Sequence, residues 1–212
     1  VKLEFTPLNS YIAEYGTALN LQSWKTIQEL TPGTGQGGTL VDYLAKWRTQ
    51  ELRAINQTIQ AGLFNGQGTA QIAKGIQRII GLDGGTGAAY KALRIAQTEG
   101  TKALNAGNFM ASLAAQEQGL PMRKRWAAIL DMSTRDAHAD ADGQEVGLNE
   151  PFDVDGEALM YPGTGGSAEN VINCRCTYID VIEGTSPEVR GAKDPETGEY
   201  RYFEWANYRD WE

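Results

Sequence analysis

The chain has 212 residues, of which 41% are hydrophobic and 22% are charged, and its formal net charge is -8. This size and composition suit a globular protein with one good core or two small domains. The acidic balance argues against a broadly basic surface for nucleic acid. The sequence contains no run of about 18 apolar residues, so no transmembrane helix is expected.

The first residues, VKLEFTPLNS, have neither the basic n-region nor the apolar h-region of a signal peptide, so none is expected. The chain starts at Val1 rather than methionine, and both an excised piece of a longer protein and a processed product stay open. Apolar residues at helical spacing predict a helix over residues 8–30. The glycine-rich stretch 31–38 interrupts this pattern and is predicted to be a loop or hinge.

Three further helices are predicted before residue 120. Thr39 is expected to cap a helix that ends near residue 63, and Thr69 to cap a short helix that ends near residue 80. A long helix with a stripe of small residues follows over residues 88–118. The sequence Gly119-Leu120-Pro121 is a stop signal for that helix.

After Pro121 the apolar pattern changes to short segments, which predict a small mixed module. Its expected elements are a strand at 126–130, a polar helix or loop at 136–142, a tight turn at 153–156 and strands at 159–161 and 174–182. The basic residues Arg123, Lys124 and Arg125 are predicted to form a solvated turn before the first strand.

The sequence therefore predicts an α+β protein with a helical N-terminal region followed by a small mixed module with a few short strands. The expected divisions are residues 1–120, residues 121–182 and an aromatic-rich C-terminal tail over residues 183–212. Exposed aromatic patches usually mark interfaces. The tail is therefore expected to pack on the core or on a partner.

One quarter of the chain gathers the residue types that bind metals. His138 is the single histidine, and Cys174 and Cys176 are the two cysteines. Imidazole and thiolate are preferred zinc ligands, and Asp142, Asp140 or Asp136 could supply a fourth. A structural zinc that joins the cysteine segment to the histidine segment is one hypothesis for these residues.

A hydrogen-bond network is the second hypothesis. Arg135 and Arg175 can pair with Asp131, Asp136, Asp142 or Glu169, His138 can bond a main-chain carbonyl, and the cysteines can pack as small apolar groups.

Catalysis is the third hypothesis, with His138 as general acid or base and a cysteine as nucleophile. However, no sequence motif here is diagnostic of an enzyme. The glycine-rich stretches 33–38 and 163–166 do not join a strand to a helix as a phosphate loop does. We therefore expect no enzymatic activity.

The order and spacing of several motifs resemble the phage Mu F-like head morphogenesis family, the minor capsid proteins of tailed bacteriophages. The resemblance covers residues 50–182. It is carried by the segments 59–77 and 94–100, by Lys124-Arg125-Trp126, Asp131, Thr134-Arg135, His138, Asp142-Gly143-Gln144, Pro151-Phe152, Tyr161-Pro162-Gly163 and the run 169–176, which includes Asn173. Gln97 stands where this family usually has arginine, and Thr164 to Gly166 replace a frequent aspartate.

This resemblance implies a structural protein of the phage head. Its implied partners are the portal or other capsid proteins, with weak DNA contact as an alternative role in packaging and no membrane association. Its implied location is the capsid interior, and the host cytoplasm during assembly. Because family modules are sometimes joined to toxin domains, the resemblance also leaves nuclease or ADP-ribosyltransferase activity open.

Overall fold

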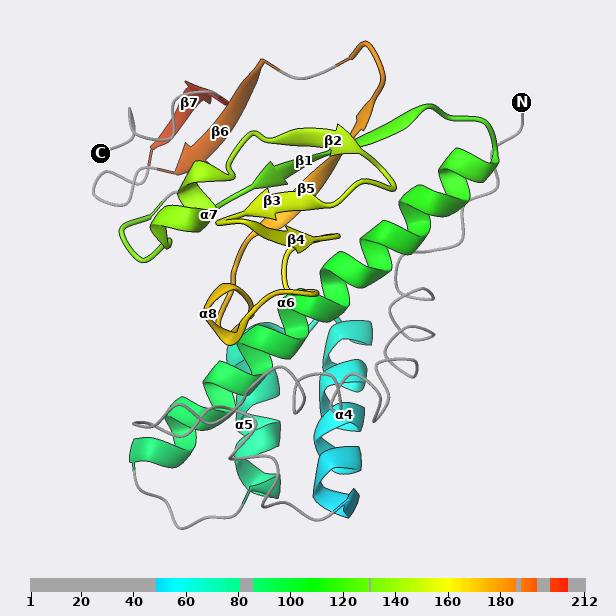
Figure 1. The fold of residues 1–212 in the computed structure, drawn as a ribbon. Coiled ribbons are helices and arrows are strands. Elements are labelled where there is room, and N and C mark those ends of the chain that lie inside the picture. Colours follow the sequence, from blue (N-terminus) through cyan, green and yellow to red (C-terminus); the bar gives the residue numbers. More distant parts are fainter. Residues whose placement is uncertain (1–48, 81–85, 130, 186–187, 194–198, 206–212) are drawn as a thin grey trace.

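The computed structural model describes residues 49–80, 86–129, 131–185, 188–193 and 199–205. The predicted helix at 8–30, the predicted hinge at 31–38 and the start of the second helix lie outside these residues. The described part is α+β, with a helical unit followed by short antiparallel strands, which confirms the predicted fold class (Figure 1).

The helical unit consists of α4 (Thr49–Phe64), α5 (Thr69–Ile79) and α6 (Thr86–Glu117). Its core is formed by isoleucine and alanine side chains: Ile55, Ile59, Ile72, Ala73, Ile76, Ala92, Ile95 and Ala96. Gly68 is the N-cap of α5, and its N–H donates to Gln71 Oε1 at 3.1 Å. The expectation that Thr69 caps this helix was therefore wrong, because Thr69 is already the first helical residue.

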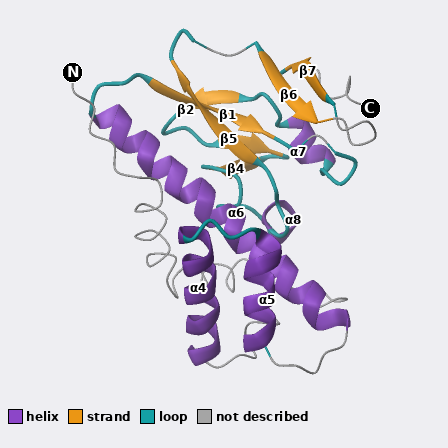
Figure 2. Cartoon of the chain, turned by 180° about the vertical axis from the view of Figure 1, so that it is seen from behind, coloured by secondary structure: helices purple, strands orange, loops and turns teal. Residues whose placement is uncertain are grey.

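Helix α6 joins the two halves of the molecule. At 1.5 Å per residue its 32 residues extend about 48 Å, from α4 and α5 to the sheet (Figures 1 and 2). It ends at Glu117, just before the predicted stop signal, and Gly119 has a φ of 93°, in the left-handed region. Leu120 N donates to Ala115 O and Gly119 N donates to Gln116 O, the bonding pattern of a Schellman motif.

The module is built on a three-stranded antiparallel sheet in the order β2-β1-β5. The strands are β1 (Met122–Ala127), β2 (Glu145–Gly147) and β5 (Thr177–Ile182), and Trp126 pairs with Tyr178. The remaining elements are α7 (Asp136–Asp140), the hairpin of β3 (Phe152–Val154) and β4 (Glu157–Leu159), and α8 (Ala168–Val171). The hairpin turn at 153–156 and the short helix after 136 agree with the sequence predictions.

Three strand positions differ from expectation. The first strand begins at Met122 rather than at residue 126, and β4 ends at Leu159, before Tyr161. The last predicted strand begins at Thr177, so both cysteines precede it in a loop. Pairing of β1 with β2 and β5, and of β4 with β3, fixes these bounds. Such register is not visible in local apolar spacing.

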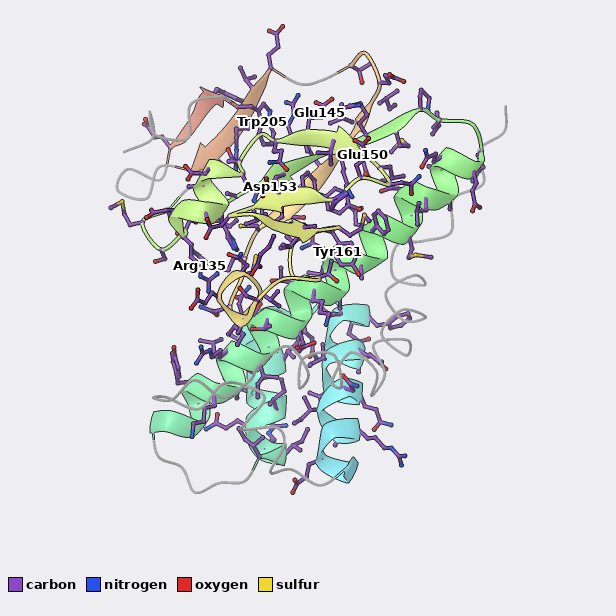
Figure 3. The ribbon with its side chains drawn as sticks, viewed as in Figure 1. Arg135, Glu145, Glu150, Asp153, Tyr161 and Trp205 are labelled. Atoms are coloured by element: carbon purple, nitrogen blue, oxygen red, sulfur yellow. The ribbon has the colours of Figure 1, made fainter. Side chains whose placement is uncertain are left out.

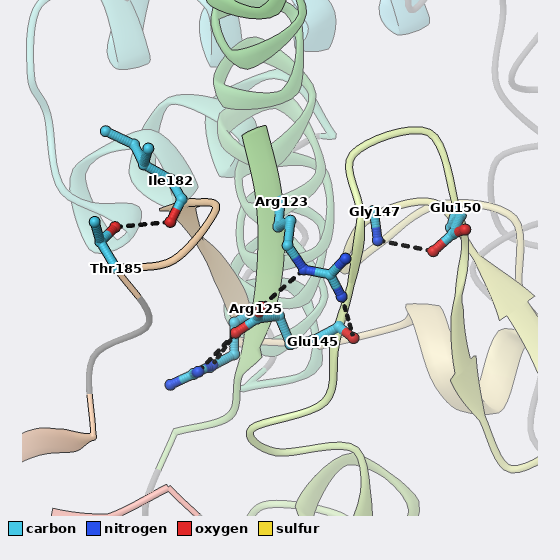
Figure 4. A network of polar contacts seen from close by, with 7 residues as sticks. All are labelled: Arg123, Arg125, Glu145, Gly147, Glu150, Ile182 and Thr185. Atoms are coloured by element: carbon cyan, nitrogen blue, oxygen red, sulfur yellow. Dashed lines mark hydrogen bonds and ion pairs between the residues drawn. The ribbon is translucent and has the colours of Figure 1, made fainter. Parts of the chain in front are cut away.

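The basic cluster was wrongly predicted to be a solvated turn, because it lies inside β1. Alternate strand residues face opposite sides, so Arg123 and Arg125 share one side while Lys124 and Trp126 share the other. Arg123 and Arg125 both bind Glu145, at 2.8 and 2.6 Å (Figure 4). Lys124 is fully buried. The cluster therefore offers much less basic surface than its sequence suggests.

Lys124 is enclosed by aromatic rings and one main-chain acceptor. Its Nζ donates to Met160 O at 2.6 Å and lies about equally far from two ring centroids, 5.0 Å for Phe109 and 5.1 Å for Phe152. Burial lowers the pKa of Lys124 to about 8, and the charge of Glu150 opposes this shift. Folding therefore disfavours the charged form of this amine.

This burial predicts a stability that rises with pH. Between pH 8 and 10.5 the unfolded chain still holds the Lys124 proton while the folded chain has lost it, so raising the pH favours folding. From pH 7 to 10 the free energy of unfolding should rise by roughly 2–3 kcal/mol relative to a Lys124→Met variant. Urea denaturation of both proteins at each pH measures the difference, and parallel pH profiles would contradict it.

The C-terminal segment forms a hairpin of β6 (Val189–Lys193) and β7 (Tyr200–Glu204). Trp205, just after β7, is buried with its ring near two guanidinium groups, 5.1 Å from Arg125 and 4.7 Å from Arg190. Arg190 also binds Asp142 and donates to Ala128 O. These contacts hold the hairpin against the module. Among the described helices, none is long and apolar enough to cross a membrane.

Candidate metal centre

The structure brings together the three side chains that the sequence marked as metal ligands. His138 lies in α7, and Cys174 and Cys176 lie in the loop between α8 and β5. All three are buried, and their ligand atoms lie within 4.8 Å of one another. His138 Nδ1 is 3.3 Å from Cys176 Sγ and 3.7 Å from Cys174 Sγ.

These spacings suit a tetrahedral zinc ion. With Zn–S near 2.3 Å and Zn–N near 2.0–2.1 Å, tetrahedral geometry puts a nitrogen and a sulfur ligand about 3.5 Å apart. The two measured distances lie on either side of that value. A direct bond between thiol and imidazole also fits 3.3 Å, so geometry alone permits both the metal and the hydrogen-bond hypothesis.

The surroundings of the two sulfurs shift their pKa values in opposite directions. The Cys176 N–H donates to Cys174 Sγ, and the Ile129 N–H donates to Cys176 Sγ. The side-chain hydrogen bond from Cys176 lowers the pKa of Cys174 to about 5, with a further contribution from His138. The same bond, with burial, raises the pKa of Cys176. These shifts favour the thiolate at Cys174 and the thiol at Cys176, whereas a bound divalent cation would favour thiolate at both.

Local backbone geometry places the cysteines. Asn173 has a φ of 59°, and this left-handed residue turns the chain between α8 and the first cysteine. Asn is among the few non-glycine residues that adopt this conformation readily. Cys174 N then donates to Val171 O at 3.3 Å. Arg135, the N-cap of α7, donates to Ile172 O on the same loop and lies between α7 and α8 (Figure 3).

Aromatic packing fixes the imidazole. Trp126 and Phe152 are both buried, as expected of core residues, with ring centroids 5.3 Å apart. The His138 ring meets Trp126 almost perpendicularly at 5.7 Å. His138 Nε2 is buried without a hydrogen-bond partner among the described residues. Among the described residues, the polar contacts of this ring are therefore those of Nδ1 with the two sulfurs.

Asp142, expected as the fourth ligand, lies outside the three-residue group. Its Oδ1 accepts from Ala128 N at 2.7 Å and from Arg190, and its side chain is 1% exposed. Asp136 and Asp140, the other candidates, lie on α7 but likewise outside the group. A fourth ligand from any of these aspartates stays a prediction.

The other expected motif residues support the loops around the group. Arg175 binds Asp131 through two hydrogen bonds, which lower the pKa of that carboxyl group. The Thr134 hydroxyl donates to Ile129 O. Pro162 is buried, and its carbonyl accepts from Asn105 at 2.9 Å. Arg175 thus contacts an acid as expected, whereas Arg135 binds a carbonyl rather than a carboxylate.

Sequence reasoning missed two supporting residues, Thr98 and Asn105 on α6. Both are buried polar side chains, each 2% exposed. Their one visible signal is spacing: they lie seven residues apart, so they share one face of the long helix, and polar side chains on a buried face need partners in the interior. The sequence does not show which loop supplies those partners.

The part of the chain that holds the helical unit and most of the module matches a known protein family. Residues 53–179, more than half of the chain, match phage Mu protein F like protein, and the chain belongs to this family. The family and the span expected from the sequence are thereby confirmed.

Two curated relatives match most of the chain. Over 186 residues it is 36% identical to an Enterococcus faecalis protein named NAD(+)--arginine ADP-ribosyltransferase EFV. This match covers 87% of this chain and 36% of that protein. Over 209 residues it is 32% identical to minor head protein GP7 of Bacillus phage SPP1. This match covers 96% of this chain and 66% of that protein. The chain thus spans less than two thirds of either relative. No solved structure matches it significantly.

Proposed function

We propose that the chain acts as a minor head protein of a tailed bacteriophage. The observation that carries this proposal is the match to a minor head protein over 96% of the chain, together with membership of the family. The role is structural and involves no reaction. Its partners are the portal or other capsid proteins, and its locations are the virion interior and the host cytoplasm during assembly.

Purified heads test this role. A tagged copy of the protein, supplied to the phage that encodes it, should be found in purified heads in few copies per particle. Mass spectrometry of heads and of the soluble fraction measures its distribution. A protein found in the soluble fraction alone, with heads of normal composition, would overturn the proposal.

We further propose that His138, Cys174 and Cys176 bind a structural zinc ion. The support is the chemistry of the donor set: three buried ligands of the types that zinc prefers, at suitable spacing, with main-chain N–H groups directed at both sulfurs. Zinc would join α7 to the loop before β5, so its binding energy would contribute directly to folding of the module.

The proposed parts of the chain are a helical region, residues 1–120, the module, residues 121–182, and the tail, residues 183–212. The change from helices to strands after Pro121 supports the first boundary. The contacts of Arg190 and Trp205 with the module support a tail that packs on the core.

An ADP-ribosyltransferase is the alternative that one relative's name raises. The matched region is 36% of that protein, so its named activity need not reside there. Incubation with labelled NAD(+) and an arginine-rich acceptor protein decides the matter. We expect no transfer, and transfer that is lost in a folded His138→Ala variant would favour the enzyme instead.

A further inference from the structure

We propose that α6 belongs to the framework of the metal centre: Thr98 and Asn105 hold the two ends of the cysteine loop, residues 173–177. Metal binding and the docking of α6 onto the module are then thermodynamically linked. This inference rests on the proposed zinc site and adds residues from outside the module to it.

Thr98 holds the entry to the loop. Its Oγ1 accepts from Asn173 N at 2.8 Å and donates to Arg94 O at the same distance. Asn173 is the left-handed residue directly before Cys174. The hydroxyl thus satisfies the main-chain donor of a residue in an uncommon conformation, and it ties that residue to a rigid helix.

Asn105 holds the exit of the loop, about two helical turns further along α6. Its Nδ2 donates to Cys176 O at 3.0 Å and to Pro162 O at 2.9 Å. Its Oδ1 accepts from the Thr177 hydroxyl at 2.8 Å. The side-chain amide therefore binds the main chain of one proposed ligand and the side chain of the next residue.

Helix α6 packs closely against the loops of the module, which leaves little room for relative movement. Gly163, beside Pro162, has a φ of 92°. A Cβ added at this residue would lie 3.2 Å from Lys102 Cα. Ile172, directly before Asn173, packs against the core of the helical unit. The loop that carries the cysteines thus contacts both cores, so displacement of α6 would displace the sulfurs.

Residues that orient metal ligands influence affinity although they do not touch the metal. Loss of such a partner typically weakens metal binding by about 10–100-fold. By linkage, an interaction that improves metal binding is itself strengthened by the metal. Zinc at this site would therefore also stabilise the junction between the helical unit and the module.

The test compares zinc affinities of single variants of the full chain. Thr98→Val keeps the shape of the side chain but removes the acceptor for Asn173 N. Thr98→Ser retains the hydroxyl. Thr101→Val is the matched control, because the Thr101 hydroxyl accepts from Gln97 Nε2 at 3.1 Å on the same helix and, within the described part of the chain, makes no hydrogen bond to the cysteine loop. Asn105→Ala removes the second contact.

Competition with a chromophoric chelator gives the Zn²⁺ affinity, and Co²⁺ absorption reports the sulfur ligands and their geometry. Thr98→Val and Asn105→Ala should each bind Zn²⁺ about 10–100-fold more weakly. Thr98→Ser and Thr101→Val should bind like the unsubstituted chain. Circular dichroism of each metal-free variant shows whether it is folded. If Asn105→Ala does not fold, the comparison rests on Thr98→Val.

Two results would overturn the inference and are distinguishable. If the unsubstituted chain binds Zn²⁺ but folded Thr98→Val and Asn105→Ala bind it equally tightly, α6 does not support the site, although the zinc proposal survives. If the unsubstituted chain takes up neither Zn²⁺ nor Co²⁺, the zinc proposal fails, and the inference fails with it.

Discussion

Removing zinc should lower the melting temperature of the chain by about 8–16 °C. At a free Zn²⁺ concentration roughly 1,000 times Kd, binding adds about 4 kcal/mol to the free energy of unfolding. For a chain of about 200 residues, 1 kcal/mol corresponds to roughly 2–4 °C. The effect is large because the ion would join α7 to the loop before β5, two segments that are distant in sequence.

Thermal unfolding with Zn²⁺ and with excess chelator measures this shift. A Cys176→Ser variant is the control, since it keeps the loop but lacks one thiolate, and it should melt at the same temperature in both conditions. An unsubstituted chain that melts identically with and without chelator would instead support the hydrogen-bond network as the role of His138 and the cysteines.

Asp142→Ala should destabilise the folded chain by about 3–5 kcal/mol. The carboxylate is 1% exposed and its partner Arg190 is 14% exposed, so the substitution leaves a largely buried guanidinium without its counter-charge. It also removes the acceptor for Ala128 N. Because Arg190 comes from β6, the C-terminal hairpin should detach before the rest of the module unfolds.

Asp131→Ala is the matched control for Asp142→Ala. Asp131 also pairs with an arginine, but both side chains are 32% exposed, so its loss should cost about 1 kcal/mol or less. Urea denaturation compares the two variants, and equal losses would contradict the argument from burial. The zinc content of folded Asp142→Ala then tests Asp142 as a ligand. Because Asp142 lies outside the group of three ligand residues, we expect folded Asp142→Ala to retain its zinc. Loss of zinc from the folded variant would instead identify Asp142 as the fourth ligand.

The sequence predicted features that depend on local chemistry. The end of α6 follows from Gly119, which adopts the left-handed conformation, with Pro121 just beyond it. The turn before Gly156 follows from residues that favour turns. His138, Cys174 and Cys176 were recognised because few side chains bind metals, and a chain with one histidine and two cysteines leaves little choice.

The sequence did not predict features that depend on distant partners. Arg123, Lys124 and Arg125 resemble a solvated turn until β2 supplies Glu145 and the aromatic residues enclose Lys124. The cysteines were assigned to a strand because CRCTYIDVI alternates, but pairing with β1 begins only at Thr177. Thr98 and Asn105 escaped notice because their partners lie more than 50 residues away along the chain.

The most direct test is elemental analysis of untagged protein purified with reductant and without added chelator. The account predicts close to one zinc per chain in the unsubstituted protein and much less in folded His138→Ala. Protein that is folded and reduced but carries no zinc, and takes up none when Zn²⁺ is added, would contradict a structural metal centre at His138, Cys174 and Cys176.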